Sequence, residues 1–150
     1  MSFVYTPFKA KLLKGEVDLD LPQDIRIMLI KLKASTTTDT EQDTEFISSF
    51  TTLGELVATN YVRKALAGEV VNQDDPNNRA EFDANDVTFT TLGGAANDTI
   101  GAILLFRFVT NDADSIPIAY IDNAGADFSQ ATNGSDITIA WDVEGILQAT

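Results

Sequence analysis

The sequence contains no cysteine and no histidine among its 150 residues. Disulfides, zinc sites, cysteine nucleophiles, serine triads with an imidazole base, and haem or iron–sulfur ligation by Cys or His are therefore excluded. Most of the charged side chains that remain are carboxylates. The lack of cysteine does not indicate a compartment, because a particle released from a cell can also do without disulfides.

Long hydrophobic runs are also missing. The most apolar stretch, IGAILLFRFV, is interrupted by Arg107 and is far shorter than the roughly 20 residues of a membrane helix. The start, MSFVYTPFKAKLL, lacks the continuous apolar segment of a signal peptide, because Lys9 and Lys11 fall inside it. We therefore expect a soluble protein that is made in the cytoplasm and has no membrane partner.

Positive charge is scarce and unevenly placed. The chain has 10 Lys and Arg against 23 Asp and Glu, a net charge of -13. Residues 1–33 hold six of the basic residues and only four of the acidic ones, and no Lys or Arg follows Arg107. The acidic remainder would repel a phosphate backbone, so no nucleic-acid partner is expected. The N-terminal segment is the part suited to face an acidic partner.

Hydrophobic residues make up 44% of the chain, enough for the core of one ordinary domain. Thr6, Pro7 and Gly15 mark the N-cap, first turn and stop of a short helix, and a second short helix is expected near residues 46–54. Short alternating or continuously apolar segments predict strands in IRIMLIKLK, YVRKALAGEVVN, VTFTTL, TIGAILLFRFVT, IPIAYID, ITIAWD and around Ile146 and Leu147. In VTFTTL, the side chains of Val87, Phe89 and Thr91 are expected on one face.

These elements predict a single mainly β domain that spans residues 1–150. Its expected form is an antiparallel β-sandwich or open barrel of about six to eight strands, with the short N-terminal helix packed at one end and one further short helix. The polar, Thr-rich run ASTTTDTEQDT is predicted to be a mobile loop.

Acidic clusters at residues 74–75, 83–86 and 111–114 carry the oxygen ligands that calcium prefers. No segment has the EF-hand pattern, however, and Asp and Asn are favoured turn formers, so we interpret the clusters as solvated turns. Paired carboxylates also serve glycosidases. With so many acidic residues chance pairs are common, and no sequence cue marks a raised pKa. We therefore assign no metal, cofactor or catalytic residue and expect no enzymatic activity.

Two aromatic features are open between packing and binding. Trp141 lies in an alternating strand, where a core position is favoured and an interface anchor is the alternative. The segment Ser2-Phe3-Val4-Tyr5 either packs back on its own domain or belongs to a docking arm, residues 1–6, that buries its aromatic rings on a neighbour. The arm is the favoured interpretation, since each full burial contributes about 2 kcal/mol before ordering costs.

Five short blocks follow one another in a fixed order: AKLLKGEVDL, DIRIML, FDANDVTFT, IPIAYIDNA and NGSDITIAWD. Together they resemble a widespread family of small virion proteins of tailed bacteriophages, whose members typically carry LLKGxID, DDIKVxLV, ADDVTF, LIAYID and NGGDITIxWDNG. This chain departs from that pattern at Val143-Glu144-Gly145, where the family has Asn-Gly, and in its ILQAT end. Such proteins look like capsid decoration proteins or other minor head proteins.

The resemblance implies a capsid decoration (cement) protein that binds the outside of the shell where several subunits meet and stabilises it through many copies. Its partners would be the major capsid protein and further copies of itself, with a trimer favoured at a three-fold site. Charge asymmetry and the aromatic N-terminus place the shell or subunit interface at Phe3, Tyr5, Phe8, Lys9, Lys11 and Lys14. The alternatives are a receptor- or glycan-binding module that uses loops 34–45 and 123–136, and a head–tail or tail component.

Overall fold

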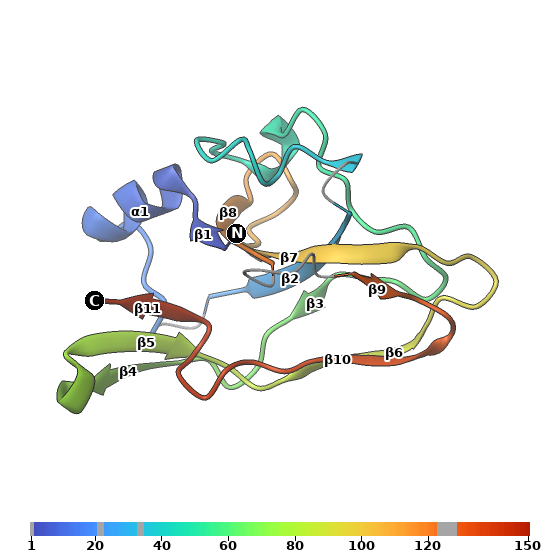
Figure 1. Ribbon diagram of the computed structural model, residues 1–150. Coiled ribbons are helices and arrows are strands. Elements are labelled where there is room, and N and C mark those ends of the chain that lie inside the picture. Colours follow the sequence, from blue (N-terminus) through green and yellow to red (C-terminus); the bar gives the residue numbers. More distant parts are fainter. Residues whose placement is uncertain (1, 21–22, 33–34, 123–128) are drawn as a thin grey trace.

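A computed structural model describes residues 2–20, 23–32, 35–122 and 129–150 of the chain (Figure 1). Antiparallel strands dominate it, so the prediction of a mainly β fold is confirmed. Within the described residues, the helical elements with assigned bounds are α1 (Thr6–Leu13) and the 3-10 turns η2 (Ile47–Ser49) and η3 (Asp75–Asn77). The strands are β1 (Phe3–Val4), β2 (Ile25–Lys31), β3 (Lys64–Ala65), β4 (Val70–Asp74), β5 (Arg79–Asp83), β6 (Val87–Leu92), β7 (Thr99–Arg107), β8 (Ile116–Ile121), β9 (Gln130–Ala131), β10 (Ser135–Ile139) and β11 (Leu147–Ala149).

A central sheet with the order β1-β8-β7-β2-β3 forms the middle of the molecule, and β9 extends it beside the start of β7. Its three inner strands are buried on both faces, which accounts for their continuously apolar sequences. In the β2–β7 pair, Leu29 lies opposite Ile103. The prediction that β2 and β7 are core strands is confirmed.

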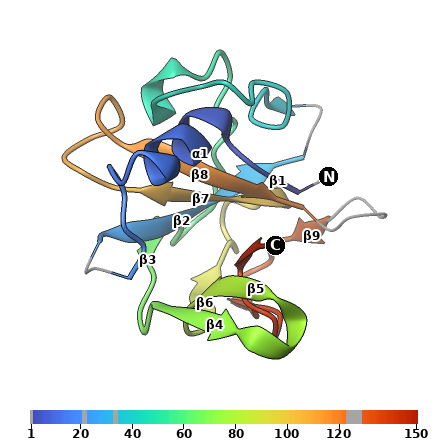
Figure 2. The same cartoon turned by 90° about the vertical axis from the view of Figure 1, so that its left-hand side faces the viewer.

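A long antiparallel ribbon forms a second layer below the central sheet (Figures 1 and 2). One side of the ribbon is β5 followed by β6, and the other is β10 followed by β11, with β4 added outside β5. Phe82, Phe89 and Ile139 point from it into the core between the layers. The two layers make the sandwich that the sequence predicted.

The opposite face of the central sheet is covered by α1 and by the segment 35–56 (Figures 1 and 2). The prediction of a mobile Thr-rich loop is wrong for residues 35–44, because the side chains of Thr38 and Thr44 are buried there. Tyr5 Oη donates a hydrogen bond of 2.6 Å to the carbonyl of Thr38, which anchors the loop on the core. Residue 34 lies outside the described residues.

Some local predictions change in the folded chain. The second short helix is only the 3-10 turn η2. The N-cap of α1 is Tyr5, and Thr6, the predicted N-cap, is the first residue of the helix. The helix ends before Gly15, whose φ of 70° makes it the expected stop. β3 and β4, on either side of Gly68, belong to different sheets.

A bulge in the β6–β10 pair overturns the predicted alternation of VTFTTL. The register shifts between Ser135 and Ile137, and Thr91 takes a φ of 47°. The extra residue reverses the alternation beyond it, so Thr91 is exposed and Leu92 is buried in its place.

Candidate binding surfaces

The N-terminal segment packs back on its own domain. β1 pairs with β8, the ring of Phe3 stacks on Tyr120 at 5.5 Å, and the backbone N–H of Tyr5 donates to the carbonyl of Ile118. The side chains of Tyr5 and Phe8 are 0% and 1% exposed. The favoured interpretation of residues 1–6 as a docking arm is therefore wrong for the described residues 2–6, and Tyr5 and Phe8 belong to the hydrophobic core.

The three lysines predicted at the interface lie on α1 or directly after it. Lys9 is exposed, whereas Lys11 Nζ lies 3.2 Å from a carboxylate oxygen of Glu45 and 3.8 Å from one of Glu16. Lys14 Nζ lies 3.9 Å from the same Glu16. Nearby carboxylates thus partly neutralise the positive charge, and contact of the lysines with a partner stays a prediction.

An apolar groove of about 570 Å³, which we call the α1 groove, lies between α1 and the β5–β11 edge of the ribbon. Phe8 and Leu12 form its helical wall, and Phe82 and Leu147 form its sheet wall. Leu12 is 44% exposed, and Leu13, the next residue, is 89% exposed. Exposed leucines next to an apolar groove are typical of a contact surface.

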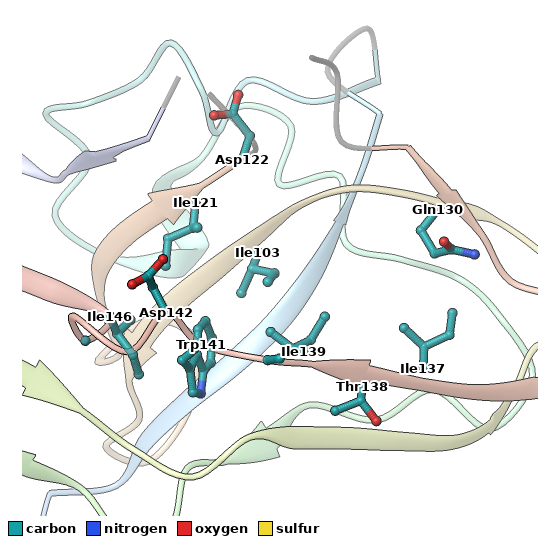
Figure 3. Close-up of a pocket in the computed structure, with 12 residues that line it drawn as sticks. Ile103, Ile121, Asp122, Gln130, Ile137, Thr138, Ile139, Trp141, Asp142 and Ile146 are labelled. Carbon is teal, nitrogen blue, oxygen red and sulfur yellow. The ribbon is translucent and has the colours of Figure 1, made fainter. Parts of the chain in front are cut away.

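A second hollow, the inter-sheet pocket, opens between the central sheet and the ribbon and has a volume of about 660 Å³ (Figure 3). Figure 3 shows Ile137, Ile139 and Trp141 in a row on the ribbon, with Ile103 and Ile121 facing them from the central sheet. The polar side chains of Asp122, Gln130, Thr138 and Asp142 also line it. The sequence signal for this pocket was the two-residue period of Ile137, Ile139 and Trp141, which does not distinguish a core face from a pocket wall.

Trp141 combines both roles that the sequence left open. Its ring packs against the core and lines the inter-sheet pocket, and it is half-buried. Its Nε1 donates to the carbonyl of Asn85 at 3.2 Å, and its backbone N–H donates to Asp86 Oδ1 at 3.1 Å. These two bonds hold the ring in place at one end of the pocket.

The acidic clusters are used in turns and ion pairs. Asp74 accepts a hydrogen bond of 3.0 Å from Arg79 Nε, and Asn111 Oδ1 accepts one from the backbone N–H two residues later. Asp112 accepts from the guanidinium of Arg63, which holds the pKa of that carboxyl below its usual range although partial burial opposes the shift. Among the described residues, no three His, Cys, Asp or Glu side chains gather into a group suited to a metal ion.

Sequence reasoning missed the ion network around Arg63. Its guanidinium donates to both carboxylate oxygens of Glu55 at 2.8 Å and also pairs with Asp112, while Tyr61 Oη donates to Glu55 Oε1 at 2.9 Å. The guanidinium of Arg63 is paired with both carboxylates, so we interpret the network as a structural link between chain segments. No pattern in the sequence links these residues, and Arg63 and Asp112 lie 49 positions apart.

Searches against models of protein families, curated proteins and solved structures find no match to this chain. Of the helices in the described residues, none has the length and apolar character needed to cross a membrane.

Proposed function

We propose that this chain is a structural protein of a tailed-bacteriophage virion that decorates the outside of the capsid and cements it. The observation that carries the proposal is the ordered set of five sequence blocks. These blocks fall on α1 and the turn after it, on β2, on the β5–β6 junction, on β8 and on β10. The resemblance therefore extends over both layers of the fold.

The shell-binding surface in this proposal is the α1 groove with its exposed leucines. Groove and helix are preformed, so binding orders little of the chain, and this lowers the entropic cost compared with a docking arm. Burial of one leucine contributes about 2 kcal/mol. A contact of this size is weak alone, but it stabilises a shell when many copies hold adjacent subunits together.

The charge distribution supports the same orientation. The lysines of α1 lie beside the groove, whereas residues 34–150 hold 4 Lys and Arg against 19 Asp and Glu, a net charge of -15. With the groove on the shell, the acidic surface away from the groove faces solvent, where it keeps the particles soluble and apart. The chain then acts by binding alone, in line with its lack of Cys and His.

Quantitative mass spectrometry of purified virions tests the assignment. We expect this protein in a copy number that rises in proportion to the major shell protein across capsids of different size. A dozen or fewer copies, on the order of one symmetric ring, would place it at the tail axis and refute decoration. Absence from the particles would refute the proposal, and a low copy number together with binding on a glycan array would favour the receptor-binding alternative.

Rebinding to shells stripped of decoration tests the surface. Leu12→Ser removes a partly exposed apolar side chain from the wall of the α1 groove, and we expect reduced occupancy and earlier DNA release on heating. Val143→Ser is the matched control, because Val143 is 96% exposed and lines neither hollow. Equal occupancy for both variants would show that the α1 groove is not the contact.

A further inference from the structure

The inter-sheet pocket borders the free edge of a strand. All six residues from Ile137 to Asp142 line it, although successive side chains of a strand point to opposite faces. Residues of both faces reach one cavity only if the cavity runs along the strand's edge. Within the described residues, β10 pairs with β6 on one side and with no strand on the other.

The apolar wall of the pocket has the spacing of an extended chain. Ile137, Ile139 and Trp141 recur at every second residue, so neighbouring side chains in this row are about 6.8 Å apart. A peptide laid along β10 as a further strand repeats the same spacing. Its alternate side chains then enter the pocket, opposite Ile103 and Ile121 (Figure 3).

Charge selects among extended partners. Among the residues that the structure describes, the pocket lining includes Asp122 and Asp142 and no Lys or Arg. A second copy of this chain, with its own net charge of -13, would bring further negative charge to this edge. A segment that carries Lys or Arg beside its aliphatic residues meets a complementary potential instead.

We infer that the inter-sheet pocket is a docking site for an extended, aliphatic peptide segment with a basic residue at one end, which adds to the free edge of β10. Backbone hydrogen bonds hold the segment, the aliphatic wall selects its alternate side chains, and the carboxylates of Asp122 and Asp142 favour its basic end. The surface is separate from the α1 groove, so this site does not depend on the virion assignment.

Trp141 is the only tryptophan in the chain, and its ring lines the pocket, so its fluorescence reports occupancy directly. The probe is the capped peptide Lys-Val-Ile-Val-Ile-Lys, titrated into the intact protein. We expect a saturable change in emission and an affinity that falls as salt is added. The acidic peptide Glu-Val-Ile-Val-Ile-Glu should bind roughly tenfold more weakly.

Two further experiments distinguish the addition of a strand from simple apolar binding. A probe that is N-methylated at the residues facing β10 keeps its side chains but lacks the backbone donors, and it should lose most of its affinity. Ala140→Lys places a cation at an exposed position of the pocket lining and should abolish binding of the basic probe. Val143→Lys adds the same charge outside the lining and is the matched control.

The inference is overturned by an unchanged Trp141 spectrum, by equal binding of the basic and acidic peptides, or by full affinity of the N-methylated probe. It is also overturned if Ala140→Lys and Val143→Lys bind the probe equally well while circular dichroism shows both folded. The result that supports it is saturable, salt-sensitive binding that only the N-methylation, the charge reversal and Ala140→Lys weaken.

Discussion

Arg63 joins segments that are distant in the sequence. Its guanidinium lies between Glu55 and Asp112, and its Cζ is 5.4 Å from the centre of the Phe106 ring in the central sheet. The hydrogen bonds that the guanidinium donates to Asp112 and Glu55 raise the pKa of Arg63 despite partial burial, and an arginine side chain is charged throughout the usual pH range. The network therefore ties the segment before β3 to the turn between β7 and β8.

Replacing Arg63 by Met should lower the free energy of unfolding by about 1–2 kcal/mol. Glu55 and Asp112 then face each other without a cation, but both are partly exposed, so solvent limits the cost. Urea denaturation measures it. The control is Arg107→Met, which removes the same charge, since Arg107 has no ion pair within the described part of the chain. Equal losses for the two variants would contradict a role for the network.

Acid should remove the difference in the free energy of unfolding between the wild type and Arg63→Met. Because the pKa of Asp112 is lowered in the folded state, its contribution to stability is complete above the usual aspartate pKa of about 3.9. The contribution is lost as the pH falls through the lower folded pKa. Denaturation curves from pH 7 to pH 2 should show a constant gap down to about pH 5 that narrows below about pH 4. A gap of constant size throughout this range would exclude the Arg63–Asp112 pair as its cause.

At the scale of elements, the β2–β7 pair shows how closely two backbones approach in the central sheet. The register shifts between Ile30 and Lys31, near Gly101 of β7. A Cβ at Gly101 would lie 2.6 Å from the Cα of Leu32 and 2.7 Å from the carbonyl oxygen of Lys31. Glycine is needed here for space, because the atoms in the way belong to the backbone of the neighbouring strand.

Gly101→Ala should therefore cost about 2 kcal/mol, through displacement of the end of β2. Gly15→Ala provides the comparison, since Gly15 has a φ of 70° and nothing within 4 Å of its Cβ position. That variant carries only the conformational cost of the left-handed region, about 1 kcal/mol. Thermal denaturation of both variants tests the order, and a larger loss for Gly15→Ala would refute the close approach.

At the scale of the whole molecule, the three tyrosines of the chain are all held neutral by the fold. Burial raises the pKa of Tyr120 to about 12, and burial together with nearby carboxylates raises the pKa of Tyr5 and Tyr61 further. Tyr5 and Tyr120 lie where the N-terminal segment meets the central sheet, and Tyr61 lies in the layer between sheet and ribbon. Ionisation of these rings therefore requires the central sheet to lose its contact with the N-terminal segment on one face and with the ribbon on the other.

Alkaline titration should show no tyrosinate absorbance near pH 10, the usual pKa of tyrosine. Because the folded pKa values are raised, stability is complete below pH 10 and is lost as the pH rises toward them. Tyrosinate should then appear in one cooperative step, together with the loss of the β signal in circular dichroism. Gradual ionisation around pH 10 in the folded protein would contradict the burial of these side chains.

The inner strands and the glycines that end a helix or form a turn were predictable because their sequence signals are local. A strand buried on both faces needs apolar residues in succession, as in β2 and β7, and a left-handed turn favours glycine, as at Gly15 and Gly68. The two-residue strands β1, β3 and β9 have no such signal. They exist only because a longer strand offers them hydrogen bonds.

The sequence by itself determined the mainly β class, the central strands, the acidic surface and the absence of Cys and His chemistry, since these follow from composition and short-range pattern. Only the tertiary structure decided that Tyr5 is a core residue, that Thr91 lies in a bulge and that Trp141 lines a pocket. The reason is that each of these depends on which strand lies opposite and in which register. The α1 groove and the inter-sheet pocket likewise arise between elements that are far apart along the chain.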